Sequence, residues 1–595
     1  MSEARAAWLE RGTLGLASLL VGLAVTGPLL APGFVLAYDM VFVPAPPLSE
    51  ALLGLSRNVP RSVPTGLLVA MASKVLTGQV VQKLVLFAIF AGAAYGAARL
   101  VPAERRVARV AAGVLYAWNP LMYERLLLGQ WTLLLGYAVL PWVAGEALGF
   151  RRGAPRAGRR LTLALAVAMA AGPYSGMFGL AVAAAIALFP PAGAPARRAG
   201  VLIALGLAVN LPWLVPGLLH PSAPERLPLA VELFRARSDS PLGTLGSLLS
   251  LGGLWRTDLA PPGRQGGAWI PAFLLMCGIG AWGWSWLKAR WAHGAVRGLA
   301  ALALLGLVLA IAPSLPGLQD GMEWASRAIP GGGALRDSQK FVIPLALLGS
   351  VAFGAGVDRI LERLKEGDRL ARRAALVLPL LPVALAPTLA WGAWGRLSPV
   401  SYPFSWNRVE SVLVADPVPG AVLSLPWHSY LPLSWNRDRT VRQIAPIYFS
   451  RPVVADTALR VGRFTLPAED PWSRLAAPAA TGKAPLRPRL PELGVRYVVL
   501  LKEADWRSWL PSLQGLSLVF ETGDLALFRS DGPTLVPTFP EPPAVPVLAG
   551  DAVTLAVILW AMLGGAARAR LGWGSAVMLR SERLQRHKRP RNSQG

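Results

Sequence analysis

The sequence predicts a polytopic α-helical membrane protein that carries a small α/β domain outside the membrane. The 595-residue chain is 54% hydrophobic and only 15% charged, and its mean hydropathy is +0.46, which is too apolar for a soluble protein of several domains. Long apolar stretches recur along the chain, and Lys and Arg gather in alternate loops between them. Near the C-terminus the composition changes to short apolar runs with many prolines.

Apolar stretches long enough to span a bilayer recur about twelve times, because a hydrocarbon core about 30 Å thick needs roughly 20 residues per helix. They start near Gly12, Gln82, Val107, Trp131, Leu161, Met177, Val201, Trp269, Leu299, Phe341, Ala374 and Val547. The first stretch, residues 12–35, is longer than a signal-peptide core and follows acidic as well as basic residues, so we interpret it as a retained anchor. The even number of spans places both termini on one side.

The cationic loops predict which side that is, since short loops rich in Lys and Arg stay in the cytoplasm. Arg105, Arg106 and Arg109 occupy one such loop, and residues 359–373 another. Both termini are therefore predicted to be cytoplasmic in a multi-pass protein of the cell (plasma) membrane. The net charge of +26 is explained by these loops, so we expect no nucleic-acid partner. Cys277 is the single cysteine, which excludes an intrachain disulfide.

Four regions follow from this pattern. Residues 1–396 form the transmembrane helical domain, and residues 397–546 form the outer α/β domain. In that domain residues 421–426, 495–501 and 525–528 read as strands, and residues 506–513 as a helix. Residues 547–567 form the final transmembrane helix, and residues 568–595 a basic cytoplasmic tail on anionic headgroups. Within the first outer loop, residues 49–55 and 67–76 are expected to form short helices along the membrane surface.

Asp39, directly beyond the first span, is a candidate catalytic residue. A carboxylate there can bind a divalent cation such as Mg or Mn, or act as a general base on a sugar hydroxyl; the alternative is an ordinary solvated Asp. Glu124 in the second outer loop is the other catalytic candidate and would share the cation with Asp39. Arg125 beside it can grip phosphate in a bidentate geometry, or form a local ion pair with Glu124. Gln130 and Trp131 can bind and stack on a sugar, or anchor the helix.

Arg336 and Lys340 lie four residues apart at the start of the tenth span, which puts them on one helical face. Two cations at a helix N-terminus favour a lipid phosphate or pyrophosphate, while anchoring at the interface is the alternative. His220 is a further substrate-binding candidate in the outer segment that follows the seventh span. No HxxxH or His-carboxylate spacing supports a metal site at this histidine.

The chain resembles the GT-C class of integral-membrane glycosyltransferases, most closely the arabinofuranosyltransferase-type and YfhO-like membrane proteins. The likeness rests on Tyr38-Asp39 after the first span, the long first outer loop, Glu124 in the second, and the outer domain near the C-terminus. Three segments carry its closer part: residues 119–131, 336–341 and 493–498. The resemblance implies that Asp39 and Glu124 are the acidic residues of the first and second outer loops. The class often shows paired acidic residues, and Asp39 has no adjacent carboxylate.

The leading hypothesis is transfer of a sugar from a polyprenyl-phosphate donor to a cell-envelope glycan, lipid or protein acceptor on the outer face. The first alternative is a lipid or glycan transporter or flippase; the spans are nearly free of charge, whereas coupled carriers place ionisable groups near the midplane. The second alternative is a non-catalytic cell-envelope scaffold. An enzyme is expected to gather Asp39, Glu124 and at least one of Arg336 and Lys340, whereas a scaffold would leave them apart.

Overall fold

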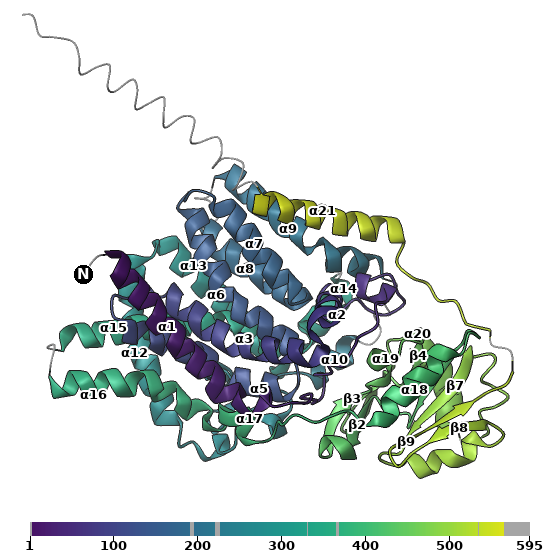
Figure 1. Ribbon diagram of the computed structural model, residues 1–595. Helices are drawn as coiled ribbons and strands as arrows, with labels where there is room; N and C mark the ends of the chain where they lie inside the picture. Colours follow the sequence, from purple (N-terminus) through teal and green to yellow (C-terminus); the bar gives the residue numbers. More distant parts are fainter. Residues whose placement is uncertain are drawn as a thin grey trace, which may run out of the picture.

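The protein consists of a large helical part and a smaller sheet-containing part beside one end of it (Figure 1). The computed structural model describes residues 3–190, 195–220, 227–329, 331–364, 368–482, 484–532 and 535–563. The predicted basic tail, residues 568–595, lies outside the described residues. So do the last four residues of the predicted final helix.

Eight helices among the described residues are long and apolar enough to cross a membrane, or nine if one bent pair counts as a single span. The bent pair, Arg369–Leu385 and Pro387–Trp394, turns by 82° at its break. The chain is thus a multi-pass helical membrane protein. The eight helices are α1 (Glu3–Thr26), α3 (Gly78–Leu100), α6 (Trp131–Arg151), α9 (Ala196–Leu219), α12 (Ile270–Arg290), α13 (His293–Ile311), α15 (Ile343–Arg363) and α21 (Ala544–Leu563).

The expected number of about twelve differs from this count because three further predicted stretches form shorter helices. They are α4 (Arg106–Ala117), α7 (Ala157–Ala170) and α8 (Pro173–Leu188), of 12, 14 and 16 residues. Helices α7 and α8 meet at Gly172, whose φ is +119°, and Pro173 begins α8 because its missing N–H costs nothing in a first turn. Hydrophobicity alone did not reveal these breaks.

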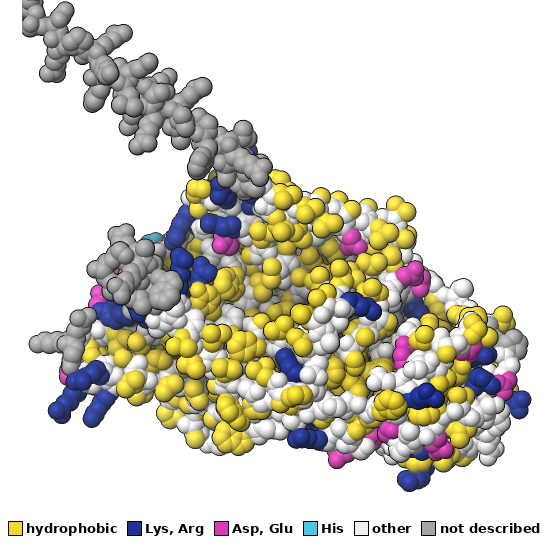
Figure 2. Space-filling model, in the orientation of Figure 1, with side chains coloured by type: hydrophobic (Ala, Val, Ile, Leu, Met, Phe, Trp, Pro, Cys, Tyr) yellow, Lys and Arg dark blue, Asp and Glu magenta, His cyan; other side chains and the backbone are white. Residues whose placement is uncertain are grey.

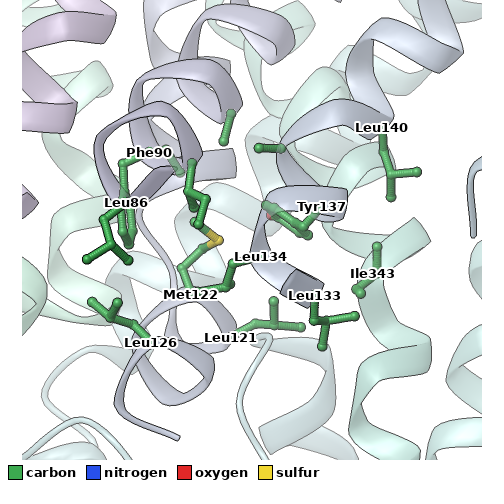
Figure 3. Close-up of a cluster of buried hydrophobic side chains, with 14 of the residues drawn as sticks. Leu86, Phe90, Leu121, Met122, Leu126, Leu133, Leu134, Tyr137, Leu140 and Ile343 are labelled. Carbon is green, nitrogen blue, oxygen red and sulfur yellow. The ribbon is translucent and has the colours of Figure 1, made fainter. Parts of the chain in front are cut away.

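Helix α5 (Pro120–Leu127) follows α4 and lies inside the bundle. The Asn119 side chain caps it by accepting a hydrogen bond from the Met122 amide at 3.1 Å, and Pro120 occupies its first turn. Its apolar residues Leu121, Met122 and Leu126 are buried among side chains of α3 and α6 (Figure 3). A buried helix so short is held by packing rather than by intrinsic helix propensity.

Short helices complete the helical part. The two that were expected in the first outer loop are confirmed as η2 (Glu50–Leu53) and α2 (Thr65–Leu76). The others are α10 (Leu227–Leu233), α11 (Gly243–Leu249), α14 (Leu318–Ala328), α16 (Arg369–Val377) and α17 (Ala390–Trp394). In the space-filling view an apolar band covers the middle of the helical part, and cationic side chains gather over α15 and α16, at the end far from the sheet (Figure 2).

The sheet region contains one five-stranded sheet with the order β4-β1-β7-β9-β8. Strands β4, β1 and β7 are parallel, whereas β9 pairs antiparallel with β7 and β8. The three strands and the helical segment expected here are present, the latter as the 3-10 helix η13 (Trp506–Leu513). The strands are β1 (Ala421–Leu425), β4 (Val453–Val454), β7 (Val495–Leu501), β8 (Ser517–Glu521) and β9 (Leu525–Arg529).

Two hairpins and three helices surround this sheet. The β2–β3 hairpin matters most for the site, because it lies against the first outer loop. The elements are β2 (Tyr430–Leu433), β3 (Arg439–Arg442), β5 (Leu459–Val461), β6 (Phe464–Leu466), α18 (Phe404–Ala415), α19 (Ala445–Tyr448) and α20 (Pro471–Thr481).

Candidate functional site

Asp39 lies at the junction of the helical part and the sheet region. Its side chain is exposed, and the Tyr430 hydroxyl from β2 donates a hydrogen bond to Asp39 Oδ1 at 2.5 Å. Burial and the Asp39 charge together raise the pKa of Tyr430 well above its ordinary value, although Arg442 and Arg61 oppose this rise. Tyr430 therefore keeps its proton and acts as the donor to the Asp39 carboxylate.

Backbone pairing fixes the position of the Asp39 loop. The Tyr38 amide donates to the Thr440 carbonyl at 2.8 Å, and the Arg442 amide donates to the Tyr38 carbonyl at 2.9 Å. The loop thus lies beside β3 in the manner of a parallel strand. The side chain of Tyr38 accepts a hydrogen bond from Arg256 Nη2 at 2.8 Å, and the Arg256 guanidinium stacks over its ring.

The second outer loop touches the first through the backbone. The Asp39 amide donates to the Leu128 carbonyl at 3.2 Å. Gly129 has a φ of +76°, and a Cβ at this position would lie 2.2 Å from the Ala37 carbonyl oxygen and 2.3 Å from the Met40 nitrogen. Only glycine fits both the left-handed conformation and this close approach.

Glu124, one turn before Leu128 on α5, is fully buried. Its Oε2 accepts a hydrogen bond from Gln339 Nε2 at 2.5 Å, while Oε1 has no donor. The carboxyl group neighbours that of Asp239 within hydrogen-bonding reach. Burial and the charge of Asp239 raise the pKa of Glu124 well above its ordinary value, against the opposing effect of Arg264.

Asp239 is the charged member of this carboxyl pair. Its Oδ1 accepts from Arg264 Nη2 at 3.0 Å, and its Oδ2 accepts from the Gly253 amide at 2.9 Å. Burial would raise the pKa of Asp239, but the charge and hydrogen bond of Arg264 outweigh it and lower the pKa. A protonated Glu124 that donates to an ionised Asp239 therefore satisfies both buried groups.

Arg125, which has no exposed surface in its side chain, is surrounded by acceptors. Its Nη1 and Nη2 contact both oxygens of Asp337, Nη2 at 2.9 Å. Its Nε and Nη2 also donate to Gln339 Oε1 at 3.0 and 2.6 Å, and Nη1 donates to Gln130 Oε1 at 2.6 Å. Arg125 therefore joins the second outer loop to the segment that precedes α15.

Arg336 and Lys340 occupy that same segment, close to Arg61 of the first outer loop. Lys340 is buried; its Nζ donates to the Arg336 carbonyl at 2.5 Å and lies 4.0 Å from the centre of the Tyr174 ring. The Arg336 guanidinium is 24% exposed and lies 3.4 Å from Glu469 of the sheet region. Burial alone would lower the pKa of Arg336, but the neighbouring Tyr174, Glu469 and Asp337 together outweigh this effect and raise the pKa.

The remaining predicted residues have packing and anchoring contacts. Gln130 accepts from Arg125 as described, and Trp131 packs against Phe42 with ring centres 4.8 Å apart. His220 Nε2 donates to the Arg57 carbonyl at 2.9 Å, which ties the end of α9 to the first outer loop. Hydrogen bonds thus link Glu124, Arg125 and Gln130 to residues 336–340, and Asp39 joins the second outer loop through the backbone contact with Leu128.

Sequence reasoning missed several residues of this region. Asp337 and Gln339 stand inside the segment that was singled out, and their alternation with Arg336 and Lys340 was the available signal. Tyr430 and Glu469 come from the sheet region, about four hundred residues after their partners Asp39 and Arg61. Only the tertiary fold brings these residues to the site.

The carboxylates do not by themselves complete a metal site. In the part of the chain that the structure describes, no three His, Cys, Asp or Glu residues lie together in a way that would hold a metal ion. Glu124 directs one oxygen to Gln339 and the other to Asp239. A divalent cation shared by Asp39 and Glu124 therefore stays a prediction, and no step below depends on it.

Comparison with known proteins identifies the fold. No family model and no curated protein matches the chain. Among solved structures, it is similar to the single-particle cryo-EM structure of the arabinofuranosyltransferase AftD from Mycobacteria, with a TM-score of 0.60 and 17% sequence identity. The fold of this chain is that of a membrane glycosyltransferase structure. The match covers 88% of this chain and 40% of AftD.

Two structures of a point mutant of AftD match in the same way, with TM-scores of 0.57 and 0.52 at 16% identity. Each match covers 88% of this chain and 42% of the mutant enzyme. The chain therefore spans about two fifths of the length of AftD. The resemblance to arabinofuranosyltransferases of the GT-C class, expected from the sequence, is confirmed at the level of the fold.

Proposed function

We propose that this protein is a membrane glycosyltransferase that moves a sugar from a polyprenyl-phosphate donor to a cell-envelope glycan, lipid or protein acceptor. The observation that carries the proposal is the placement of Asp39, within a fold shared with an arabinofuranosyltransferase. Its exposed carboxylate stands where the first span, the second outer loop and the sheet region meet. An acceptor can approach such a carboxylate from the aqueous side.

Asp39 acts as the general base in this proposal. As the acceptor oxygen bonds to the anomeric carbon, the bond from that carbon to the phosphate oxygen breaks, and the acceptor proton passes to Asp39. The hydrogen bond from Tyr430 fixes the carboxylate through Oδ1, which leaves Oδ2 to receive the proton. Glu124, buried and paired with Asp239, acts as a positioning residue for the second outer loop.

Arg336 and Arg61 supply positive charge for the departing phosphate. Both guanidinium groups are partly exposed and both reach the same Glu469 oxygen, so they lie close enough to bind one anion. The Lys340 Nζ donates to the Arg336 carbonyl and so helps to hold the Arg336 backbone in position. Donors fixed in place before the reaction stabilise the charge that develops on the leaving group without reorganisation.

The proposed orientation places Asp39 and the sheet region on the outer face of the cell membrane, with both termini in the cytoplasm. The cationic surface over α15 and α16, at the end far from the sheet region, supports it (Figure 2), because cationic loops stay inside.

An Asp39→Asn variant tests the proposed base. The amide keeps the size of the carboxylate but cannot take the proton, so we expect transfer from a polyprenyl-phosphate sugar to fall by about 100-fold or more. The assay uses membranes that contain equal amounts of each variant. Asp438→Asn is the matched control, since Asp438 is exposed and has a φ of +55° that Asn tolerates. Full transfer by the Asp39 variant would refute the proposal.

A further inference from the structure

Glu469 of the sheet region bridges two arginines from distant parts of the helical region. Its Oε1 lies 2.5 Å from Arg61 Nη2 and 3.4 Å from Arg336 Nη1. Arg61 belongs to the first outer loop, Arg336 to the segment before α15, and Glu469 stands just before α20. One carboxylate oxygen thus receives donors from both cations.

The two arginines need an anion between them. Both guanidinium groups reach the same Glu469 oxygen, so their like charges lie close together. Glu469 supplies a single negative charge to this pair, while Asp337, the other acidic neighbour of Arg336, is engaged by Arg125. The prenyl phosphate that is released by sugar transfer is a phosphate monoester with up to two charges and more acceptor oxygens, so it matches two guanidinium groups better than one carboxylate does.

The anion position acts electrostatically on the side chain that holds the proposed base. Tyr430, which donates to Asp39, is influenced by the charges of both Asp39 and Arg61.

We propose that the Glu469 carboxylate occupies the phosphate position between Arg61 and Arg336 and that the phosphate of a prenyl phosphate displaces it on binding. This inference deepens the proposed function and rests on it for the lipid source of the phosphate. Glu469 is thus a built-in competitor that occupies the anion site when no prenyl phosphate is bound.

The neighbouring ion pair explains how Glu469 can leave without loss of the sheet region. Arg57 Nε contacts Asp470 Oδ1 at 2.9 Å, and the Arg57 guanidinium stacks on Trp472 at 4.6 Å. The side chains of Arg57 and Asp470 are 17% and 7% exposed. Those of Arg61 and Glu469 are much more exposed, at 52% and 36%. The buried pair can hold the sheet region against the first outer loop when the partly exposed Glu469 side chain rotates away.

The test compares Glu469→Gln with Asp470→Asn in the full-length protein in detergent. Glutamine keeps the shape of Glu469 but removes its charge, so we expect binding of farnesyl phosphate to tighten by about three- to tenfold. Asp470→Asn weakens the adjacent pair and leaves the anion position alone, so its affinity should stay within about twofold of wild type. Isothermal titration calorimetry measures both, and thermal unfolding confirms that each variant is folded.

Inorganic phosphate as a second probe distinguishes the source of the ligand. If Glu469→Gln binds both probes more tightly, the site recognises the phosphate group without the lipid chain. If it binds only farnesyl phosphate more tightly, the site recognises the lipid form. Adding Arg336→Gln to Glu469→Gln should remove the gain. Unchanged affinity for both probes in Glu469→Gln, or an equal gain in Asp470→Asn, would overturn the inference. Because binding is measured without turnover, the result stands apart from that of Asp39→Asn.

Discussion

Arg125 and Asp337 form a bidentate ion pair in which each Nη atom of Arg125 donates to one carboxylate oxygen of Asp337. The Arg125 side chain has no exposed surface and that of Asp337 is 15% exposed. The pair fastens α5 to the segment before α15, and therefore links the second outer loop to Arg336 and Lys340. The geometry of the whole region depends on this contact.

Arg125→Met should destabilise the protein strongly, because it leaves the largely buried Asp337 carboxylate and the buried Gln339 Oε1 without their donors. Loss of one partner of a buried pair costs about 3–5 kcal/mol. Thermal unfolding in detergent measures the loss. Arg489→Met is the control, since Arg489 and Glu492 are 62% and 71% exposed at 4.0 Å and such pairs contribute about 1 kcal/mol or less. Equal shifts in the two variants would contradict the structural role of Arg125.

Gly129→Ala should separate the two outer loops. The added Cβ would collide with the Ala37 carbonyl and the Met40 amide, so we expect a destabilisation of about 1–3 kcal/mol from overpacking, beyond the left-handed strain. Gly153→Ala isolates that strain, because Gly153 has a φ of +69° and nothing within 4 Å of an added Cβ. If both variants unfold at the same temperature, the close approach of Gly129 to the first outer loop does not contribute to stability.

Glu124→Gln should be tolerated in both stability and transfer, because glutamine reproduces a protonated glutamic acid. Its amide can donate to Asp239 while its carbonyl accepts from Gln339. Glu124→Leu removes both contacts and should cost about 1–3 kcal/mol. Stability and transfer are measured for both variants. A stable Glu124→Gln protein without transfer would show instead that the ionised carboxylate takes part in the reaction.

The sequence was sufficient to predict the helical membrane architecture and three of the five strands of the main sheet, and it singled out residues 124–125 and 336–340. Hydropathy and the loop charges are local properties, so they located the spans, and the polar residues at 124–125 and 336–340 stand out against apolar surroundings. The breaks that make α4, α7 and α8 short depend on Gly172, Pro173 and the Asn119 cap, which a count of apolar residues does not register.

The remaining residues of the candidate site are brought there by contacts between residues far apart in the sequence. Tyr430 and Glu469 lie about four hundred residues from their partners Asp39 and Arg61, so the sequence around them does not mark them as site residues. The pairing of Glu124 with Asp239 rather than with Arg125 was equally out of reach, because residue 239 lies in a segment that carries several charges of both signs. Spacing along the chain cannot rank such partners.

Asp416→Asn should make the sheet region less stable at neutral pH. The Asp416 carboxylate accepts from Arg496 Nε at 2.5 Å and from the Tyr497 hydroxyl at 2.6 Å. Burial would raise the pKa of Asp416, but these hydrogen bonds outweigh it and hold the pKa well below its ordinary value. Its contribution is therefore present above the ordinary pKa of 3.8 and is lost as the pH falls through the lower folded value.

The gap in unfolding temperature between wild type and Asp416→Asn should narrow as the pH falls from 5 towards about 3. Asp531→Asn serves as the control, because Asp531 is 62% exposed in its pair with Arg529. A gap that stays constant with pH would mean that the carboxylate charge of Asp416 is not what stabilises the fold.

Tyr430→Phe should slow transfer without unfolding the protein. The hydroxyl donates to Asp39 Oδ1, and a hydrogen bond to a charged group contributes about 1.5–3 kcal/mol. If that bond holds the carboxylate in position for the incoming proton, its loss lowers kcat by roughly 10- to 100-fold. The aromatic ring remains to pack against Tyr38, whose ring centre lies 6.3 Å away.

Tyr448→Phe is the control, because the Tyr448 hydroxyl donates to Asn407 at 2.6 Å within the sheet region. Equal kcat values for the two variants would show that Asp39 does not need Tyr430. A rise in KM alone would instead assign Tyr430 to acceptor binding, since an interaction that is equally strong in the ground and transition states changes KM and leaves kcat unaltered.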